Sequence, residues 1–268
     1  MRRPRARPGL HAVAALLASV VLAAGCSPPP ADALPYEVVA RYPHDPAAFT
    51  QGLLWHDGAL FESTGLYGAS SLRRVRLQDG ARERVRYLPA DVFAEGLARV
   101  GETLIQLTWK RGEAYRWPLD GFDTAPGPRE VHRYDGEGWG LCFDGERLVM
   151  SDGSASLTWR DPTTFAVLER REVRLDGEPL ARLNELECAE GRVWANVWYD
   201  DRLVRIDPAS GRVDGYLDLR DLLTDDERAA LADDAVLNGV AWRPETGTLL
   251  VTGKRWPALF ELRILDDR

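Results

Sequence analysis

The chain is poor in residues that bind metals or serve as activated nucleophiles. It has three cysteines and four histidines among 268 residues, and these are scattered, so none of them form a cluster with zinc-ligand spacing. A glycine-rich phosphate loop and a Gly-x-Ser-x-Gly elbow are also missing from the sequence. These absences disfavour metal-dependent hydrolysis, nucleotide binding and α/β-hydrolase chemistry, and we expect no metal and no cofactor.

Basic charge is also scarce relative to acidic charge. The chain has 34 Lys and Arg against 42 Asp and Glu, for a net charge of −8. Residues 1–25 hold four arginines and no acid, so the remainder has 30 basic and 42 acidic residues. An acidic balance of this size argues against a nucleic-acid partner. The sequence gives no signal for oligomerisation, and we expect a monomer.

The only long apolar run lies at the N-terminus. Residues 1–25 begin with arginines and continue with the apolar run Ala12–Ala24, which has signal-peptide length and is too short for a comfortable membrane span. The segment before Cys26 resembles a bacterial lipoprotein cleavage site. We therefore expect an exported lipoprotein, anchored through a lipid on Cys26 and facing the periplasm or cell exterior, with a proline-rich tether over 26–35. The alternative is an ordinary secretory signal and a soluble exported protein.

Cys142 and Cys188 are the only cysteines that remain after Cys26. An oxidising compartment permits a disulfide between them. The sequence does not show that the two residues meet, and the interpretation favoured here is two buried free thiols.

The sequence does contain a tripeptide that recurs five times, at intervals of 44, 44, 45 and 54 residues. A repeat of about 40–50 residues rich in short strands is typical of propeller blades. The copies are Gln51-Gly52-Leu53, Glu95-Gly96-Leu97, Trp139-Gly140-Leu141, Asn184-Glu185-Leu186 and Asn238-Gly239-Val240. The second and third positions are nearly constant, whereas the first varies.

Each copy is followed by an apolar strand, a tight glycine-containing turn and a second strand, with two further strands after them. This predicts an all-β, five-bladed propeller with four-stranded blades over residues 36–268. A closed ring must hide the edges of its first and last blades, so we expect the remaining strand, Tyr36–Tyr42, to pair with the last blade as its outermost strand. A two-sheet sandwich is the alternative, although a sandwich does not need such a repeat.

One segment, Asp221–Leu237, breaks the repeat. Thr224 or Asp225 can cap a short helix there, with acids in its first turn. We expect a helical insertion between blades four and five. Two readings stay open for it: it shapes the mouth of a pocket, or it is a neutral decoration.

The first residue of each tripeptide opens the strand nearest the propeller axis, so the five side chains should converge at one mouth of the channel. These residues are Gln51, Glu95, Trp139, Asn184 and Asn238. The equivalent residues at the ends of the second strands should return to the same face. They are Gly65, Trp109, Gly153, Trp198 and Lys254, of which Lys254 is one of only two lysines in the chain. Each residue alone is more often structural, but their coincidence at equivalent positions favours a site.

Glu95 is the only acid among the five opening residues. Aromatic walls raise the pKa of a buried carboxyl group by desolvation, and a glutamate with a raised pKa serves as general acid and base near neutrality. A two-carboxylate glycosidase mechanism is disfavoured, because the ring offers no second acid. The pattern therefore predicts proton-transfer chemistry on a small polar substrate.

Over residues 36–265 the chain resembles the propeller-type glutaminyl cyclases of plants and bacteria. The segments that carry the resemblance are Phe49–Leu53, Glu62–Gly68, Phe93–Leu97, Leu107–Trp109, Gly138–Gly140, Leu183–Glu187, Ala195–Trp198, Leu237–Gly239 and Thr252–Lys254. The resemblance implies a five-bladed propeller that converts the N-terminal glutamine of peptides or proteins to pyroglutamate and releases ammonia without a metal.

The resemblance also implies roles for individual residues. Glu95 matches the catalytic glutamate, while Gln51 and Asn184 match substrate-binding amides. The other matches are the aromatic walls Trp109, Trp139 and Trp198, the packing residue Phe49, and Lys254 at the site; Asn238 is added from the repeat alone. Two alternatives remain: a non-catalytic propeller that binds a peptide or sugar, and a propeller lactonase or hydrolase, which generally needs a metal on the axis.

Overall fold

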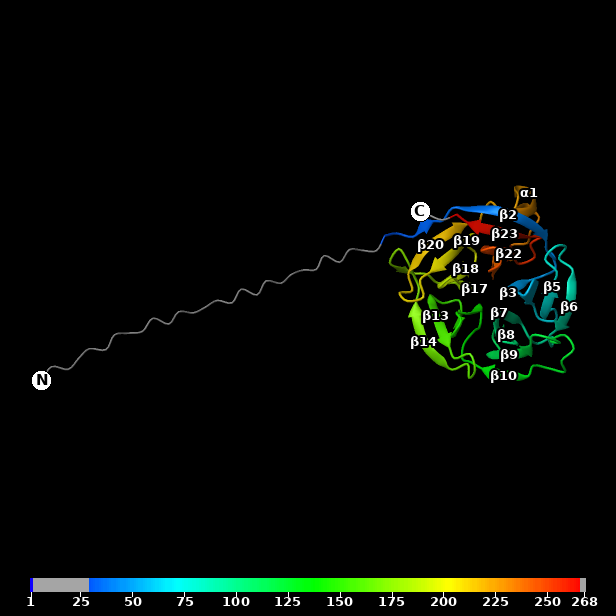
Figure 1. Cartoon of the computed structure of the whole chain (residues 1–268), viewed down its shortest axis with the longest axis horizontal. Coiled ribbons are helices and arrows are strands. Elements are labelled where there is room, and N and C mark those ends of the chain that lie inside the picture. Colours follow the sequence, from blue (N-terminus) through cyan, green and yellow to red (C-terminus); the bar gives the residue numbers. More distant parts are fainter. Residues whose placement is uncertain (2–28, 266–268) are drawn as a thin grey trace.

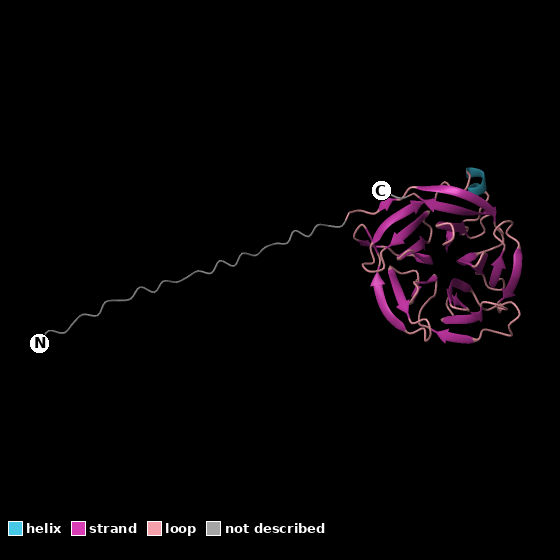
Figure 2. Ribbon diagram, viewed as in Figure 1, coloured by secondary structure: helices cyan, strands magenta, loops and turns pink. Residues whose placement is uncertain are grey.

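The computed structural model describes Met1 and residues 29–265, in which five of the six sheets form blades arranged around one axis (Figures 1 and 2). The inner strands of successive blades lie side by side, and the last returns to the first. The predicted five-bladed, all-β propeller is confirmed. The predicted signal peptide, apart from Met1, and the predicted lipid site Cys26 lie outside the described residues.

The blades follow one another along the chain, each running from the axis to the rim. Blade one holds β3 (Thr50–His56), β4 (Ala59–Thr64), β5 (Ser71–Val75) and β6 (Arg82–Tyr87). Blade two holds β7 (Ala94–Val100), β8 (Thr103–Thr108), β9 (Glu113–Pro118) and β10 (Glu130–Arg133). Blade three holds β11 (Leu141–Phe143), β12 (Leu148–Met150), β13 (Ser156–Arg160) and β14 (Val167–Glu172). Blade four holds β17 (Leu183–Ala189), β18 (Arg192–Val197), β19 (Arg202–Ile206) and β20 (Val213–Asp218). Blade five holds β21 (Leu237–Arg243), β22 (Thr248–Gly253) and β23 (Ala258–Ile264).

The glycine of the repeated tripeptide is required by the close approach of neighbouring blades. A Cβ atom on Gly96 would lie 2.5 Å from the backbone nitrogen of Leu141, and one on Gly140 would lie 2.0 Å from the carbonyl oxygen of Asn184. No side chain fits at such distances. The constant positions of the repeat therefore set the spacing of the ring.

Blade four departs from this pattern because it has Glu185 where the other blades have glycine. The Glu185 carboxylate reaches across the axis and accepts hydrogen bonds from the backbone N–H groups of Leu53 (3.1 Å) in blade one and Val240 (2.8 Å) in blade five. Glu185 is fully buried, and this burial raises the pKa of its carboxyl group well above its usual value. One side chain thus joins three inner strands at the axis.

The ring closes as the sequence predicted. The strand β2 (Tyr36–Pro43) pairs antiparallel with β23 and forms the rim of blade five. Just after β2, the buried His44 places Nε2 3.0 Å from a carboxylate oxygen of Glu62 in blade one and Nδ1 2.8 Å from the carbonyl oxygen of Trp256 in blade five. Both partners can only accept, so both ring nitrogens carry protons and His44 is a buried imidazolium. We call this contact the closure pair, His44–Glu62.

The folded unit begins earlier than expected. Within the stretch predicted to be a tether, β1 (Asp32–Ala33) pairs in parallel with β20 as a fifth strand of blade four, and Leu34 packs into the core beside it. The expected boundary at Tyr36 is therefore too late. The edge of blade four has unpaired backbone groups that can accept another strand, and β1 fills this edge. A small unpredicted hairpin, β15 (Arg174–Leu175) with β16 (Glu178–Pro179), links blades three and four.

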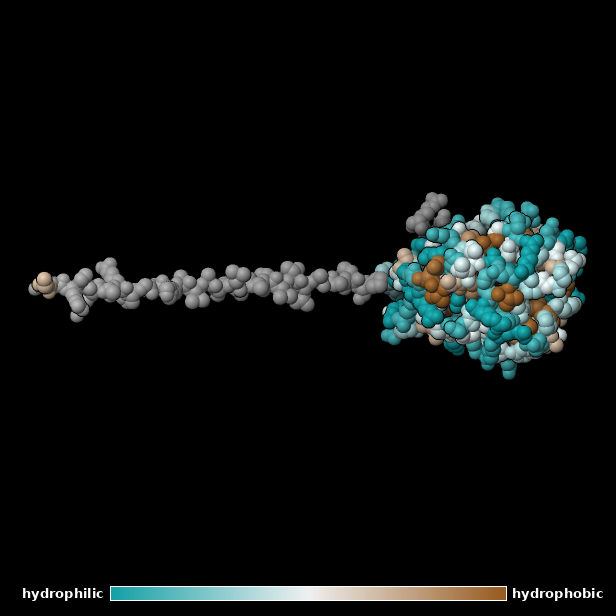
Figure 3. Space-filling view, turned by 90° about the horizontal axis from the view of Figure 1, so that it is seen from below, coloured by the Kyte–Doolittle hydropathy of each residue, from teal (hydrophilic) through white to brown (hydrophobic). Residues whose placement is uncertain are grey.

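The predicted insertion between blades four and five contains the helix α1 (Asp225–Ala229). Thr224 caps it: its side chain accepts from the Glu227 backbone N–H, and Glu227 accepts in return from the Thr224 backbone N–H. Among the described residues, no helix has the length and apolar character to cross a membrane. Figure 3 shows a mostly hydrophilic face of the molecule with small, separate hydrophobic patches.

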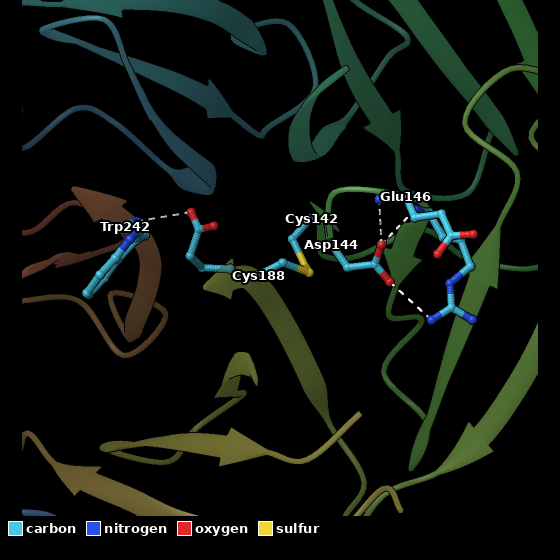
Figure 4. Close-up of a disulfide and its surroundings, with 7 residues drawn as sticks. Cys142, Asp144, Glu146, Cys188 and Trp242 are labelled. Carbon is cyan, nitrogen blue, oxygen red and sulfur yellow. Dashed lines mark hydrogen bonds and ion pairs between the residues drawn. A yellow bond between two sulfur atoms is a disulfide. The ribbon is translucent and has the colours of Figure 1, made fainter. Parts of the chain in front are cut away.

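The expectation of free thiols at Cys142 and Cys188 is wrong, because the two residues form a disulfide (Figure 4). Cys142 lies on β11 and Cys188 on β17, the inner strands of neighbouring blades, and their Cα atoms are 5.4 Å apart. This separation lies within the usual range for a disulfide. The bridge therefore ties blade three to blade four near the axis.

Candidate active site

One mouth of the propeller channel holds a cavity of about 200 Å³. Its walls are largely aromatic, and its few polar groups come from different blades. It is lined by Phe49, Gln51, Leu66, Phe93, Glu95, Trp109, Trp139, Asn184, Trp198, Asp234 and Lys254. The structure brings eight of the predicted site residues together at this cavity, namely Phe49, Gln51, Glu95, Trp109, Trp139, Asn184, Trp198 and Lys254, whereas Asn238, Gly65 and Gly153 do not line it.

Asn238 lies behind the pocket and supports it. Its amide nitrogen donates to the carbonyl oxygen of Thr50 (2.9 Å) and to the side-chain oxygen of Gln51 (3.3 Å). The side-chain nitrogen of Gln51 in turn donates to Glu95 at 2.9 Å. Asn238 therefore fixes which end of the Gln51 amide faces Glu95, and it is a positioning residue rather than part of the pocket lining.

Two of the five positions at the ends of the second strands are glycine, and the structure explains why. Trp109, Trp198 and Lys254 project into the pocket, as expected. A Cβ atom on Gly65 would lie 2.4 Å from the Phe93 ring, and one on Gly153 would lie 2.6 Å from the Trp139 ring. The ring of Phe93, which precedes β7 of blade two, takes the space beside Gly65 in blade one, and the ring of Trp139 takes the space beside Gly153 within blade three, so a side chain is excluded at both positions.

The aromatic walls pack against one another edge to face. The ring centroids of Trp139 and Trp198 are 5.5 Å apart at an interplanar angle of 88°, and Phe49 and Phe93 meet at 6.2 Å and 90°. Phe93 also contacts Trp109, at 5.4 Å. Such arrangements are favourable for aromatic pairs, so the walls support each other and exclude water from the floor of the pocket.

Glu95 lies buried on this floor, 3% exposed. Burial raises the pKa of its carboxyl group well above the usual value. The positive charge of Lys254 opposes this rise, the negative charge of Glu137 adds to it, and the hydrogen bond from Gln51 lowers the pKa again. A buried carboxyl group with a raised pKa is suited to general acid–base chemistry.

Lys254 is the cation of the pocket. Its ammonium lies 4.8 Å from the centroid of the Phe49 ring, a cation–π distance. Burial lowers the pKa of Lys254 to about 8, although the carboxylates of Glu95 and Asp234 counteract part of that effect. This ammonium is thus nearly desolvated and faces the acid of the site.

The sequence reasoning missed Phe93 and Asp234, which line the pocket, and Glu137, which lies beside its walls. Phe93 and Glu137 stand two positions ahead of Glu95 and Trp139, as Phe49 stands two ahead of Gln51. Extending the repeat by two residues would have found both. Asp234, which also lines the pocket, belongs to the helical insertion, so the insertion helps to shape the pocket.

Three of the eight non-glycine residues with a positive φ among the described residues lie beside the pocket. Leu66, Tyr199 and Arg255 have φ angles of 84°, 62° and 58°, and each follows one of the second-strand positions Gly65, Trp198 and Lys254. Left-handed conformations of non-glycine residues are costly and cluster at functional sites. Among the described residues no group of His, Cys, Asp and Glu side chains is suited to hold a metal ion.

These features define a class: a closed propeller with one acid–base carboxyl group, amide donors and a single ammonium inside an aromatic pocket. Residues 11–264 match the family model of glutamine cyclotransferases. Over 229 residues the chain is 42% identical to a glutaminyl-peptide cyclotransferase of Arabidopsis thaliana, covering 85% of this chain and 71% of that protein. The crystal structure of Myxococcus xanthus glutaminyl cyclase superimposes with a TM-score of 0.78 at 41% identity, covering 86% of this chain and 97% of the other. The chain belongs to the glutamine cyclotransferase family.

Proposed function

We propose that this protein is a glutaminyl-peptide cyclotransferase, which converts the N-terminal glutamine of peptides or proteins to pyroglutamate and releases ammonia. The observation that carries the proposal is the buried Glu95 carboxyl group, held by Gln51 at 2.9 Å on the floor of an aromatic pocket. The pocket volume of about 200 Å³ suits one glutamine side chain, with the rest of the peptide outside the mouth.

Glu95 moves the proton in the proposed reaction. The α-amine nitrogen attacks the γ-carbonyl carbon of the same glutamine, so a C–N bond forms while the bond from the γ-carbon to its amide nitrogen breaks. The Glu95 carboxylate takes a proton from the attacking amine and returns it to the departing nitrogen, which leaves as ammonia. A raised pKa suits both transfers, since the group must accept and donate at the same pH.

The remaining residues hold the glutamine in a reactive shape. The buried side-chain oxygen of Asn184 has no hydrogen-bond partner among the described residues, which suits it to accept an N–H of the substrate. The walls Trp109, Trp139 and Trp198 seat the methylene groups. The Lys254 ammonium is suited to stabilise negative charge on the γ-carbonyl oxygen as the amine attacks. Because cyclisation is intramolecular, holding the amine against the carbonyl supplies much of the acceleration.

Ammonia release from a glutamine-initiated peptide, measured in the presence of a chelator, tests the proposal. The wild-type protein should turn over, and Glu95→Gln should lose about 10²- to 10⁴-fold in kcat while keeping its circular dichroism spectrum and melting temperature. Wild-type protein that binds the peptide without releasing ammonia would indicate a binding protein instead. Near-normal turnover in Glu95→Gln would remove Glu95 from its role.

We also propose that the protein is exported and anchored through a lipid on Cys26. The leader over residues 1–25 and Cys26 directly after it support this, and so does the Cys142–Cys188 disulfide, since such bonds persist in oxidising compartments. Mass spectrometry of the N-terminal peptide tests it. A diacylglyceryl-modified Cys26 is expected in the wild type, and Cys26→Ser should release the protein from the membrane fraction.

A further inference from the structure

One carboxylate oxygen at the rim of the pocket joins two of its walls. Oε2 of Glu137 accepts a hydrogen bond from the indole N–H of Trp109 at 2.7 Å and another from the indole N–H of Trp139 at 3.0 Å. The two tryptophans come from different blades: Trp109 follows β8 in blade two, and Trp139 precedes β11 in blade three. The shared oxygen therefore fixes one wall relative to the other.

The loop that carries Glu137 is itself held against these walls. The backbone N–H of Gly138 donates to the carbonyl oxygen of Trp109 at 3.0 Å. A Cβ atom on Gly138 would lie 2.2 Å from the hydroxyl oxygen of Tyr134, so the loop has no room to shift on that side. The backbone next to Glu137 is thus constrained, and this holds the Glu137 side chain toward the two indole rings.

Fold stability alone does not require this arrangement. The Glu137 side chain is 38% exposed, so water would satisfy the two indole N–H groups if the carboxylate were absent. What water would not supply is a common anchor for the two rings. Lys110, the second of the two lysines, lies 3.9 Å from the centroid of the Trp109 ring and 3.8 Å from the other Glu137 oxygen, on the outer side of the same cluster.

We propose that Glu137 is a positioning residue of the active site, which sets the distance and tilt between the Trp109 and Trp139 walls through a single shared oxygen. The glutamine side chain is then held in the folded shape that brings its amine to its own γ-carbonyl. This inference rests on the proposed cyclase function.

The charge of Glu137 adds a second, separable effect. It is one of the groups that raise the pKa of Glu95, after the larger contribution of burial. Removing the charge but keeping an oxygen acceptor should lower the Glu95 pKa without moving the walls. Removing the side chain should do both.

Two substitutions separate these effects. Glu137→Gln keeps an oxygen that can accept both indole N–H groups, so KM should stay within about twofold, while the acid limb of the kcat–pH profile moves to lower pH. Glu137→Ala removes the anchor, and kcat/KM should fall by about ten- to a hundredfold because a reacting group displaced by about 1 Å loses that much. Asp135→Asn and Asp135→Ala are the matched controls in the same loop, since both indole N–H groups donate to Glu137 and not to Asp135, and both should behave as wild type.

The indole N–H signals in a ¹H–¹⁵N spectrum report wall position independently of activity. The Trp109 and Trp139 signals, assigned with Trp109→Phe and Trp139→Phe, should both shift in Glu137→Ala and stay close to their wild-type positions in Glu137→Gln. Unchanged kinetics in Glu137→Ala, or a loss of thermal stability alone, would overturn the proposal. If the wild-type protein has no cyclase activity the proposed function fails, whereas unmoved indole signals contradict the shared anchor itself.

Discussion

The side-chain amide of Gln51 donates a hydrogen bond of 2.9 Å to the carboxyl group of Glu95. The two residues are 44 positions apart and open the inner strands of neighbouring blades, so the contact depends on how the blades pack. Its direction matters because an N–H donor favours the charged carboxylate, whereas an amide oxygen in its place would favour the protonated form. The protein fixes this direction through Asn238.

Asn238→Ala should therefore reduce catalysis although Asn238 does not line the pocket. Losing one orienting hydrogen bond, worth about 0.5–1.5 kcal/mol, should lower kcat by about two- to tenfold. A double-mutant cycle with Gln51→Ala checks the route of the effect. If Asn238 acts through Gln51, its substitution should have little further effect on kcat in the Gln51→Ala background, and full additivity would contradict this.

Lys254→Met should move the acid limb of the kcat–pH profile to higher pH. The ammonium opposes the rise in the Glu95 pKa, so its removal lets that pKa climb further. This shift is opposite in sign to the one expected for Glu137→Gln. Lys254→Arg should also lose activity, because a guanidinium is wider than the compact ammonium it replaces; full activity in that variant would make Lys254 peripheral.

The closure pair makes stability depend on pH. Burial lowers the pKa of His44, but Glu62 and the Trp256 carbonyl outweigh it and raise the pKa above its usual value of 6.5. A raised pKa gives stabilisation that is complete below about pH 6.5 and is lost as pH rises through the folded-state value. Melting temperature should fall over that range in the wild type and much less in His44→Ala.

His44→Ala should also cost up to about 3–5 kcal/mol at pH 6, because it removes the nearest cation of the buried Glu62 and leaves it only the Thr50 hydroxyl and the Arg73 guanidinium, 3.9 Å away. His132→Gln, in blade two, serves as the control and should keep the wild-type pH dependence. A wild-type profile in His44→Ala would exclude the closure pair as its cause.

The disulfide should contribute to stability without being needed for turnover. The double variant Cys142→Ser, Cys188→Ser should unfold with a free energy about 2–4 kcal/mol lower than the wild type and retain kcat, since neither sulfur lines the pocket. Denaturant titration with and without a reductant measures this. The reductant should destabilise only the wild type, and an equal effect on both proteins would point to another cause.

The repeat predicted the blade count, and its break and its unpaired first strand predicted the helix and the closing strand. It also predicted which residues meet at the pocket, because equivalent positions in a ring converge on the axis. The disulfide was missed because Cys142 and Cys188 fall at unequal distances from their tripeptides, and alternate strand positions face opposite sides. Cys142 pairs with Val149 in the β11–β12 hairpin and Cys188 pairs with Val193 in the β17–β18 hairpin, so Cys142 lies one position further from its turn than Cys188 does.

Other features had no periodic signal at all. Asp234 comes from a segment outside the repeat, and the shared acceptor at Glu137 depends on side-chain direction rather than spacing. The sequence places Glu185 at the second position of the repeat, where the other four copies have glycine, but predicts no separate role for it. Its span across the axis to Leu53 and Val240 appears only when three blades are placed together.

The same residue bears on the spacing of the pocket. Glu185 follows Asn184 along β17, and its buried carboxylate ties blade four to the inner strands of blades one and five. Those three inner strands carry Gln51, Asn184 and Asn238 at or near their starts. A change at Glu185 should therefore alter the distance between Gln51 and Asn184 although Glu185 itself does not line the pocket.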